Sequence, residues 1–304
     1  MKTNDYVVET EGLTKRFGDR VAVDSVDLRI PRGSAFGYLG PNGAGKTTLI
    51  RMLLGLTSPT AGSMRLLDLP MPEQRARALA RVGAIVEEPR FHPFLTGREN
   101  LAIIAAARER EAHGRIAGAL TRVGLAERAN DRVATYSQGM RQRLGVARCL
   151  LADPELLILD EPMNGLDPAG MKEFRLMIRA LVAEGRTVVL SSHLLDEVEK
   201  TCDAITIVDR GRVVVQGSID ELTGDASTVL VATDDDLRAQ ALLAGHSVEP
   251  VEGGLRVRPD DDASAAAMNR RLVEAGLDVH RLEPERPSLE RRFLEITSRL
   301  EAAA

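Results

Sequence analysis

One eight-residue segment constrains the fold of this chain most, because it dictates a strand, a loop and a helix in that order. Residues 40–47 read Gly-Pro-Asn-Gly-Ala-Gly-Lys-Thr, which matches the pattern Gly-x-x-x-x-Gly-Lys-Ser/Thr. An apolar run, residues 35–39, precedes the segment, and a helix-like run, residues 48–56, follows it. The sequence therefore predicts a buried strand, a glycine-rich phosphate-binding loop (the P-loop) and a helix.

The residues of this loop suit the phosphates of a nucleoside triphosphate. The glycines let backbone N–H groups close around phosphate oxygens, where a Cβ would obstruct or strain the loop. Lys46 can reach the β- and γ-phosphates, the Thr47 hydroxyl can ligate Mg²⁺, and the helix N-terminus adds partial positive charge. The predicted nucleotide-binding residues here are Gly40, Pro41, Asn42, Gly43, Ala44, Gly45, Lys46, Thr47 and Thr48.

Length and composition limit the class of protein without choosing a function. The 304 residues can bury a large core or form two domains, and 44% are hydrophobic, as in folded proteins. The net charge of −5 argues against a general nucleic-acid binder. Residues 1–10 lack a signal-peptide core, and no apolar stretch approaches the ~18–20 residues of a membrane span. Two cysteines without metal-type spacing, Cys149 and Cys202, suit a reducing cytoplasm.

The opening segment predicts a small antiparallel sheet beside the P-loop core. Residues 7–9 and 21–30 alternate apolar and polar side chains, with a Gly-Asp turn at residues 18–19. Phe17 lies at that turn, where its ring could stack on an adenine. The alternative is a hydrophobic side chain that closes a strand end.

A second motif places two carboxylates at the end of a buried strand. Residues 156–159 are all apolar, which predicts a strand covered on both faces, and Asp160 and Glu161 follow it. In an open α/β sheet this end of a strand faces the ligand crevice. Asp160 is suited to hold Mg²⁺, and Glu161 is suited to polarise an attacking water.

A third motif predicts a second anion-binding helix end. Ser137 is a plausible N-cap of a helix that runs toward Leu151, and Gly139 lies in its first turn. The P-loop already accounts for one set of phosphates. A second phosphate-binding helix end therefore suggests a site shared between two copies of the domain.

Taken in order, these motifs resemble those of the ATP-binding subunits of ABC transporters, over about residues 5–220. Among the branches of that family, the chain is most similar to the drug- and bacitracin-export type, which pairs a single-domain ATPase with a separate membrane subunit. The matches are Phe17 at the adenine-stacking aromatic, residues 40–47 at Walker A, 136–140 at the signature, 156–161 at Walker B, 164–167 at the D-loop and His193 at the switch histidine.

The resemblance implies ATP and Mg²⁺ as cofactors and a dimer with two nucleotides held between two copies. It implies Lys46, Glu161 and His193 as catalytic residues. Further expected nucleotide contacts are Phe17, Ser137, Gln138, Gly139 and Asp167, and the expected metal ligands are Thr47, Glu87 and Asp160.

The signature departs from the usual Leu-Ser-Gly-Gly-Gln and reads Tyr-Ser-Gln-Gly-Met. Ser137 and Gly139 keep the hydroxyl and one close backbone approach, while Gln138 replaces the first glycine and Met140 the glutamine. Similar signatures recur in the export-type branch, so we expect function to survive.

A second departure lies at the Q-loop, where Glu87 takes the place of the usual glutamine. A carboxylate oxygen can still meet Mg²⁺ or its water, but it adds negative charge beside a triphosphate, which would give a weaker or more metal-dependent site. If the loop is shifted by one residue, Glu88 fills the position instead.

Residues 88–152 resemble the helical subdomain of the family. Thr96 and Glu99 have capping-box spacing for a helix over residues 98–111, with an apolar stripe of Leu101, Ile103, Ile104 and Ala105. The loop before it is apolar and kinked, and the resemblance implies that the membrane permease subunit contacts the region from Glu87 to Phe94. The alternative is a loop that only covers the core.

The last third of the chain changes character after Gly217 and Ser218, so we expect a nucleotide-binding domain over residues 1–220 and an accessory domain over 221–304. Its alternation predicts a β-α-β-β-α-β, ferredoxin-like order: strands 228–232, 247–251, 255–258 and 277–282, and helices 234–243 and 263–275. Residues 260–262 are interpreted as a solvated acidic loop, with metal binding as the alternative, and residues 287–300 as a final helix. Regulation, dimer support and a structural extension remain open roles.

The predicted fold class is therefore α/β: a P-loop NTPase core of the ABC ATPase type with antiparallel β and helical subdomains, plus a small α+β C-terminal domain. The predicted function is ATP-driven export of a drug, peptide antibiotic or lipid-like substrate, from the cytoplasmic face of the cell membrane and with no nucleic acid. The alternative is a soluble ABC ATPase that acts on nucleic acid or the ribosome. Such proteins normally carry a coiled-coil or zinc insertion or two joined domains, and this chain has one P-loop.

Overall fold

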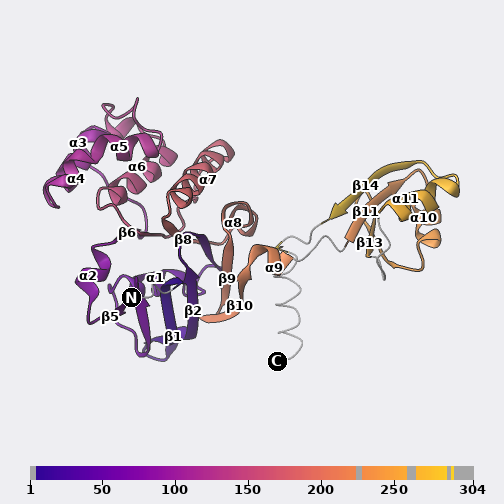
Figure 1. The fold of residues 1–304 in the computed structure, drawn as a ribbon, viewed down its shortest axis with the longest axis horizontal. Coiled ribbons are helices and arrows are strands. Elements are labelled where there is room, and N and C mark those ends of the chain that lie inside the picture. The colour runs from indigo at the N-terminus through magenta and orange to yellow at the C-terminus, as the bar shows by residue number, and fades with distance from the viewer. Residues whose placement is uncertain (1–4, 224–227, 259–264, 286–288, 291–304) are drawn as a thin grey trace. The chain divides into compact units, whose positions relative to one another are not determined.

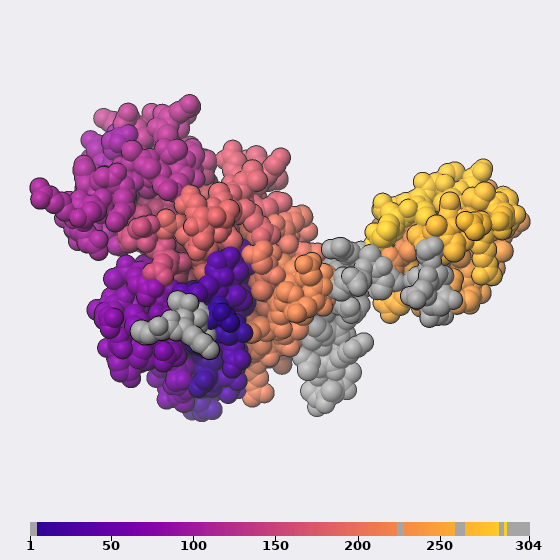
Figure 2. All heavy atoms as spheres, viewed as in Figure 1, coloured from indigo at the N-terminus to yellow at the C-terminus, as the bar shows by residue number. Residues whose placement is uncertain are grey.

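The computed structural model describes residues 5–223, 228–258, 265–285 and 289–290, and the chain divides into two compact units, residues 1–218 and 219–304 (Figure 1). The first contains a six-stranded sheet, a four-stranded antiparallel sheet and a helical region. In the space-filling view the helical region, in magenta, lies on one side of this unit, and β1 (Tyr6–Phe17) and β2 (Arg20–Pro31), in indigo, lie on the other (Figure 2).

The six-stranded sheet has the order β10-β9-β3-β8-β7-β6 and is parallel except at β10. The carboxyl ends of its parallel strands meet at one edge, which is where α/β sheets bind ligands. The segments that follow β3, β7 and β8 are therefore brought together. The strands are β3 (Ala35–Leu39), β6 (Val82–Ile85), β7 (Leu156–Leu159), β8 (Thr187–Ser192), β9 (Ala204–Asp209) and β10 (Arg212–Ser218).

The antiparallel sheet has the order β2-β1-β4-β5. Its strands are β1 (Tyr6–Phe17), β2 (Arg20–Pro31), β4 (Ala61–Leu66) and β5 (Leu69–Met71). The predicted strand at residues 7–9 is thus part of a much longer one, because β-bulges at register shifts let β1 continue where the alternation breaks. The Gly-Asp turn at residues 18–19 is confirmed.

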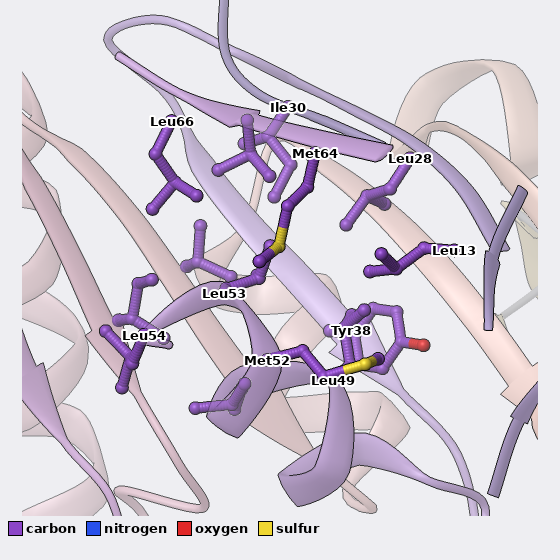
Figure 3. Packing of buried hydrophobic residues seen from close by; sticks show 14 of the residues in the cluster. Leu13, Leu28, Ile30, Tyr38, Leu49, Met52, Leu53, Leu54, Met64 and Leu66 are labelled. Carbon is purple, nitrogen blue, oxygen red and sulfur yellow. The ribbon is translucent and has the colours of Figure 1, made fainter. Parts of the chain in front are cut away.

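Helix α1 (Lys46–Leu53) joins the two sheets and fixes the P-loop between them. Its apolar face points into a core shared with β1, β2 and β4 (Figure 3). The predicted range was 48–56, so the helix starts two residues earlier and ends three residues earlier than predicted. It ends early because Gly55 adopts φ +62 and its N–H donates to the Met52 carbonyl oxygen, a helix-ending geometry. The packed side chains include Leu49, Met52 and Leu53 from α1 and Leu13, Leu28, Ile30, Met64 and Leu66 from the strands.

The helical region consists of α3 (Gly97–Ala106), α4 (Glu111–Gly114), α5 (Ile116–Arg122), the 3₁₀ turn η1 (Val133–Thr135) and α6 (Gln138–Leu150). The capping box of Thr96 and Glu99 is confirmed. The predicted stripe was wrong at Ile103, which is 47% exposed, because only Leu101 and Ala105, four residues apart, share the buried face. Helix α3 also ends at Ala106 rather than at residue 111.

Further helices complete the first unit: α2 (Arg75–Leu79), α7 (Pro168–Ala183) and α8 (Leu195–Thr201). Within the residues that the structure describes, no helix is long and apolar enough to cross a membrane.

The second unit begins with α9 (Ile219–Thr223) and has its own buried core. Its sheet has the order β12-β13-β11-β14 with antiparallel neighbours, so β13 lies between the two strands that α10 connects, a split βαβ arrangement. The ferredoxin-like assignment stays a prediction. The elements are β11 (Thr228–Thr233), α10 (Asp236–Leu242), β12 (Ser247–Val251), β13 (Gly254–Arg258), α11 (Ala265–Glu274) and β14 (Val279–Glu285).

Two details of this unit differ from the prediction or lie beyond it. The last strand starts at Val279 rather than at residue 277, because the Leu277 N–H donates to the Leu272 carbonyl oxygen in α11 and not to a neighbouring strand. The acidic segment 260–262 and all but Leu289 and Glu290 of the predicted final helix lie outside the described residues.

Candidate nucleotide site

The P-loop follows β3 and ends at Gly45, the residue that caps α1. Gly45 has φ +102, and a Cβ there would lie 2.2 Å from the Ala22 carbonyl oxygen, so glycine is required. Gly40 has no room either, since its Cβ would lie 2.3 Å from the Val208 oxygen. In the described part of the chain no side chain caps α1, so its first N–H groups stay available to phosphate oxygens.

Lys46 is buried and lies across the loop. Its ammonium donates to the carbonyl oxygens of Gly40 at 2.7 Å and Pro41 at 3.2 Å. It also lies 3.1 Å from Glu161 Oε1. The lysine therefore joins the P-loop to the carboxylate that follows β7, two segments more than a hundred residues apart in sequence.

The two predicted metal ligands from these segments are in contact. The Thr47 hydroxyl donates to Asp160 Oδ2 at 2.8 Å, and Asp160 is only 6% exposed. A hydroxyl and a carboxylate are the hard oxygen donors that Mg²⁺ prefers, and Mg²⁺ is usually held by one or two such groups together with substrate phosphates. This donor set therefore fits a magnesium ion bound beside a triphosphate.

Glu161 lies between two basic side chains. Besides Lys46 on Oε1, its Oε2 is 3.0 Å from His193 Nδ1, which donates because an ionised carboxylate only accepts. Glu161 also has φ +46, the left-handed region that residues other than glycine rarely adopt. Such strained residues cluster at functional sites.

Of these side chains, Lys46, Thr47 and Glu161 border a pocket of about 270 Å³. Phe17 stands at its rim, 53% exposed, with the Lys15 ammonium 4.9 Å from the ring centroid. The exposed ring leaves area for a base to stack. The lining residues are Phe17, Arg20, Ala22, Asn42, Gly43, Gly45, Lys46, Thr47, Thr48 and Glu161.

Glu87, the predicted third metal ligand, contacts a different partner. Its carboxylate pairs with the Arg51 guanidinium at 2.5 Å, and its backbone has φ +65. Arg51 lies one helical turn after Thr47 on the same face of α1, so Glu87 is held close to the P-loop helix but, within the described residues, is not part of the pocket lining. Its role toward the metal, and the choice between it and Glu88, stay predictions.

The signature segment forms the start of α6, with Ser137 as its N-cap. The Ser137 hydroxyl accepts from Met140 N at 3.2 Å. Gln138 Nε2 donates to the Asn164 carbonyl at 3.0 Å, and Asp167 caps α7 by accepting from Gly170 N at 3.0 Å. The signature and the D-loop are thus bonded within one chain. Among the described residues, neither segment lines the pocket of its own chain.

Sequence reasoning missed three residues at this site. Arg20 lines the pocket, and Lys15 lies over Phe17, although neither belongs to a motif. Ser191 is fully buried and hydrogen-bonds both Asp160 and Glu161. The available signal was a hydroxyl directly after the apolar run at residues 188–190, two residues before His193.

Comparisons with known proteins agree with this geometry. The family described as "ABC transporter" matches residues 23–164. An uncharacterized ABC transporter ATP-binding protein, YdbJ of Bacillus subtilis, is 38% identical, covering 96% of each chain. The bacitracin transport ATP-binding protein BcrA of Enterococcus faecalis is 38% identical, covering 96% of this chain and 97% of its own.

Among solved structures, CbiO1 of Clostridium perfringens, part of an ABC transporter complex, is 27% identical with a TM-score of 0.67. The match covers 72% of this chain and 91% of that one. On the full-length relatives and the matching fold, the chain belongs to the ABC transporter family, as one of its ATP-binding, ATP-hydrolysing subunits.

Proposed function

We propose that this chain powers an export-type ABC transporter from the cytoplasmic face of the cell membrane, with a separate membrane subunit that moves a drug, peptide antibiotic or lipid-like cargo. The observation that carries the proposal is that Lys46, Thr47 and Glu161 line one pocket. Asp160 bonds to Thr47 and His193 to Glu161, directly behind that lining. The name of one relative supports an antibiotic cargo, since BcrA is a bacitracin transport ATP-binding protein.

The P-loop side of the pocket binds and orients the triphosphate. Backbone N–H groups at the start of α1 donate to phosphate oxygens, and Phe17 stacks on the base. Lys46 exchanges its contact with Glu161 for the β- and γ-phosphates. Thr47 and Asp160 would hold Mg²⁺, which would supply positive charge to neutralise the charge that develops on the phosphates.

The Walker B side of the pocket handles the water. Once Lys46 turns to phosphate, Glu161 Oε1 is free to accept a proton from the attacking water. His193 donates to the other carboxylate oxygen and so keeps Glu161 oriented. These groups position the water for in-line attack on the γ-phosphate.

The signature helix serves a second copy of the chain. Ser137, Gln138 and Gly139 form a helix N-terminus suited to a phosphate, yet they are outside the lining of their own pocket as far as the structure describes it. In a head-to-tail dimer this end would cap the γ-phosphate bound by the partner's P-loop. ATP then favours the closed dimer, and its hydrolysis allows opening, a motion that the membrane subunit follows.

The test is light scattering of the Glu161→Gln variant with and without Mg-ATP. Loss of the general base keeps the nucleotide bound but lowers hydrolysis by ~10² or more, so the closed dimer accumulates. A doubling of mass with Mg-ATP, but not with Mg-ADP, is the expected result. If Glu161→Gln hydrolyses ATP at the wild-type rate, Glu161 is not the base. If it stays monomeric in saturating Mg-ATP, the isolated chain forms no nucleotide sandwich.

For the membrane subunit we propose a contact at residues 87–94. A groove of about 230 Å³ lies beside this segment, and Phe94 next to it is 80% exposed, which is unusual for so large an apolar side chain. Arg148 lies over the Phe91 ring and shapes one wall. The groove is lined by Arg90, Phe91, His92, Asn100, Ile103, Ile104 and Arg148.

Replacement of Phe94 tests this contact. Phe94→Glu should remove the chain from membranes that contain the partner subunit, while its own ATPase activity stays unchanged because Phe94 is outside the nucleotide pocket. Leu176→Glu is the matched control, since Leu176 on α7 is also an exposed apolar side chain. Equal membrane binding by both variants would contradict the contact.

For the C-terminal unit we propose support of the dimer or regulation, because it has a core of its own. In the part of it that the structure describes, no group of three or more His, Cys, Asp or Glu side chains could hold a metal.

A further inference from the structure

Ser191 contacts both carboxylate residues that follow β7. It lies in β8 with no exposed surface, and its Oγ donates to Asp160 Oδ1 at 2.5 Å. The same oxygen accepts from the Glu161 backbone N–H at 2.8 Å. One hydroxyl thus connects the proposed metal ligand to the backbone of the proposed general base.

At Asp160 the bond from Ser191 fixes the direction of the carboxylate. Asp160 is nearly buried, and Oδ2 already accepts from Thr47. A buried carboxylate needs a donor on each oxygen, and hydrogen bonds to charged groups are the strong ones. Without Ser191, Oδ1 loses its donor and the carboxylate can rotate away from Thr47.

At Glu161 the bond that the backbone N–H donates to Ser191 Oγ supports a strained backbone. The φ of +46 is a strained conformation, which surrounding contacts must offset. The Glu161 N–H is satisfied by Ser191, and this turn aims the side chain between Lys46 and His193.

We propose that Ser191 is a positioning residue that sets Asp160 for the metal and Glu161 for the water, an inference that rests on the proposed ATPase mechanism. Ser192 provides an internal control. It is the next residue of β8 and is also buried, but its hydroxyl accepts from Leu194 N at 3.0 Å. Successive strand residues point to opposite faces, so Ser192 is directed away from Ser191.

The experiment compares Ser191→Thr with Ser191→Val, which have nearly the same shape and differ in the hydroxyl. Both are β-branched residues that suit a strand, and they carry the same added bulk into this buried position, so any cost of overpacking is shared by the two variants. ATP affinity is measured by calorimetry in excess Mg²⁺ and in EDTA, with kcat and KM measured alongside. Unfolding midpoints of these two variants, of Ser191→Ala and of Ser192→Ala monitor stability.

Mg²⁺ should raise the ATP affinity of Ser191→Val and Ser191→Ala roughly tenfold less than it raises that of wild type. Their kcat should fall ~10–100-fold, and their ATP affinity in EDTA should equal that of wild type. Ser191→Thr should stay within about threefold of wild type, and Ser192→Ala should match wild type.

Equal behaviour of Ser191→Thr and Ser191→Val would overturn the inference, as would an equal loss in Ser192→Ala or an equal loss of affinity in EDTA, which indicates general damage. Wild-type protein that binds no ATP would instead overturn the proposed function, and the inference with it. The two failures are therefore distinguishable in one set of measurements.

Discussion

The first turns of α1 and α6 are both suited to phosphate, yet they are capped in opposite ways. The N-cap of α1 is Gly45 in a left-handed conformation, with no side-chain cap from the described residues. The N-cap of α6 is Ser137 in an extended conformation, and its hydroxyl accepts from Met140 N. The α1 end can bind phosphate within one chain. The α6 end already satisfies the Met140 N–H and offers the Ser137 hydroxyl hydrogen beside the first N–H groups of the helix, which suits a contact with phosphate bound by a second copy.

The largest effect is expected at the N-terminus of α1, which no described side chain caps. Lys46→Ala removes the ammonium that crosses the P-loop and faces Glu161, so ATP affinity should fall at least about tenfold and kcat ~10²–10³-fold. Calorimetric titration with ATP and a phosphate-release assay measure the two effects. Lys172→Ala, an exposed lysine on α7, is the control. If Lys46→Ala turns over normally, the α1 end does not bind the transferred phosphate.

At the N-terminus of α6, which Ser137 caps, Ser137→Ala should have two separable effects. Loss of the cap costs about 1 kcal/mol of stability. Loss of a donor to the partner's phosphate should also weaken the ATP-dependent dimer of Glu161→Gln by roughly tenfold or more.

Thr96→Ala is the matched control for this change, because Thr96 caps α3 in the same way. It should cost similar stability and leave dimer formation alone. Urea unfolding and light scattering at a series of concentrations measure both quantities. Equal dimer weakening in the two variants would show that Ser137 acts through helix stability only.

Gln138 tests whether the α6 end is coupled to the D-loop. Gln138→Leu removes the bond to the Asn164 carbonyl and should cost about 0.5–1.5 kcal/mol of stability. We also expect the ATP-dependent dimer to weaken by a few-fold, less than in Ser137→Ala, since the hydroxyl donor is retained. A dimer as strong as that of the parent variant would indicate that the two segments act independently.

The smallest expected effect is a pH dependence of stability, which distinguishes the cap of α3, where Glu99 carries a charge, from the neutral cap of α6 at Ser137. Hydrogen bonds from Thr96 lower the pKa of Glu99 in the capping box of α3. Because the pKa of Glu99 is lower in the folded protein than in the unfolded chain, its ionised carboxylate stabilises the fold at pH values above the unfolded pKa of about 4.3. This contribution is lost as the pH falls through the pKa of the folded state. The difference in unfolding free energy between wild type and Glu99→Ala should therefore narrow from pH 7 to pH 3. The difference between wild type and Ser137→Ala should not change.

The two ends also show what could be predicted from the sequence. The P-loop, the strand before Asp160 and the cap at Ser137 depend on neighbouring residues, so spacing and residue type were sufficient to predict them. The contacts of Ser191, of Gln138 with Asn164 and of Glu87 with Arg51 join segments 26 to 36 residues apart, which only the tertiary fold brings together. Helix α3 was predicted too long because residues 107–111 are good helix formers, while the helix ends at Ala106.

The left-handed backbone of Glu161 has a consequence for how this position changes over evolutionary time. Glycine and asparagine adopt such a conformation at little cost, whereas a glutamate destabilises the fold there. Selection for stability alone would therefore replace Glu161. A lineage that lost its need for turnover would be expected to lose this glutamate early, before the glycines of the P-loop, which the packing around Gly40 and Gly45 requires in any case.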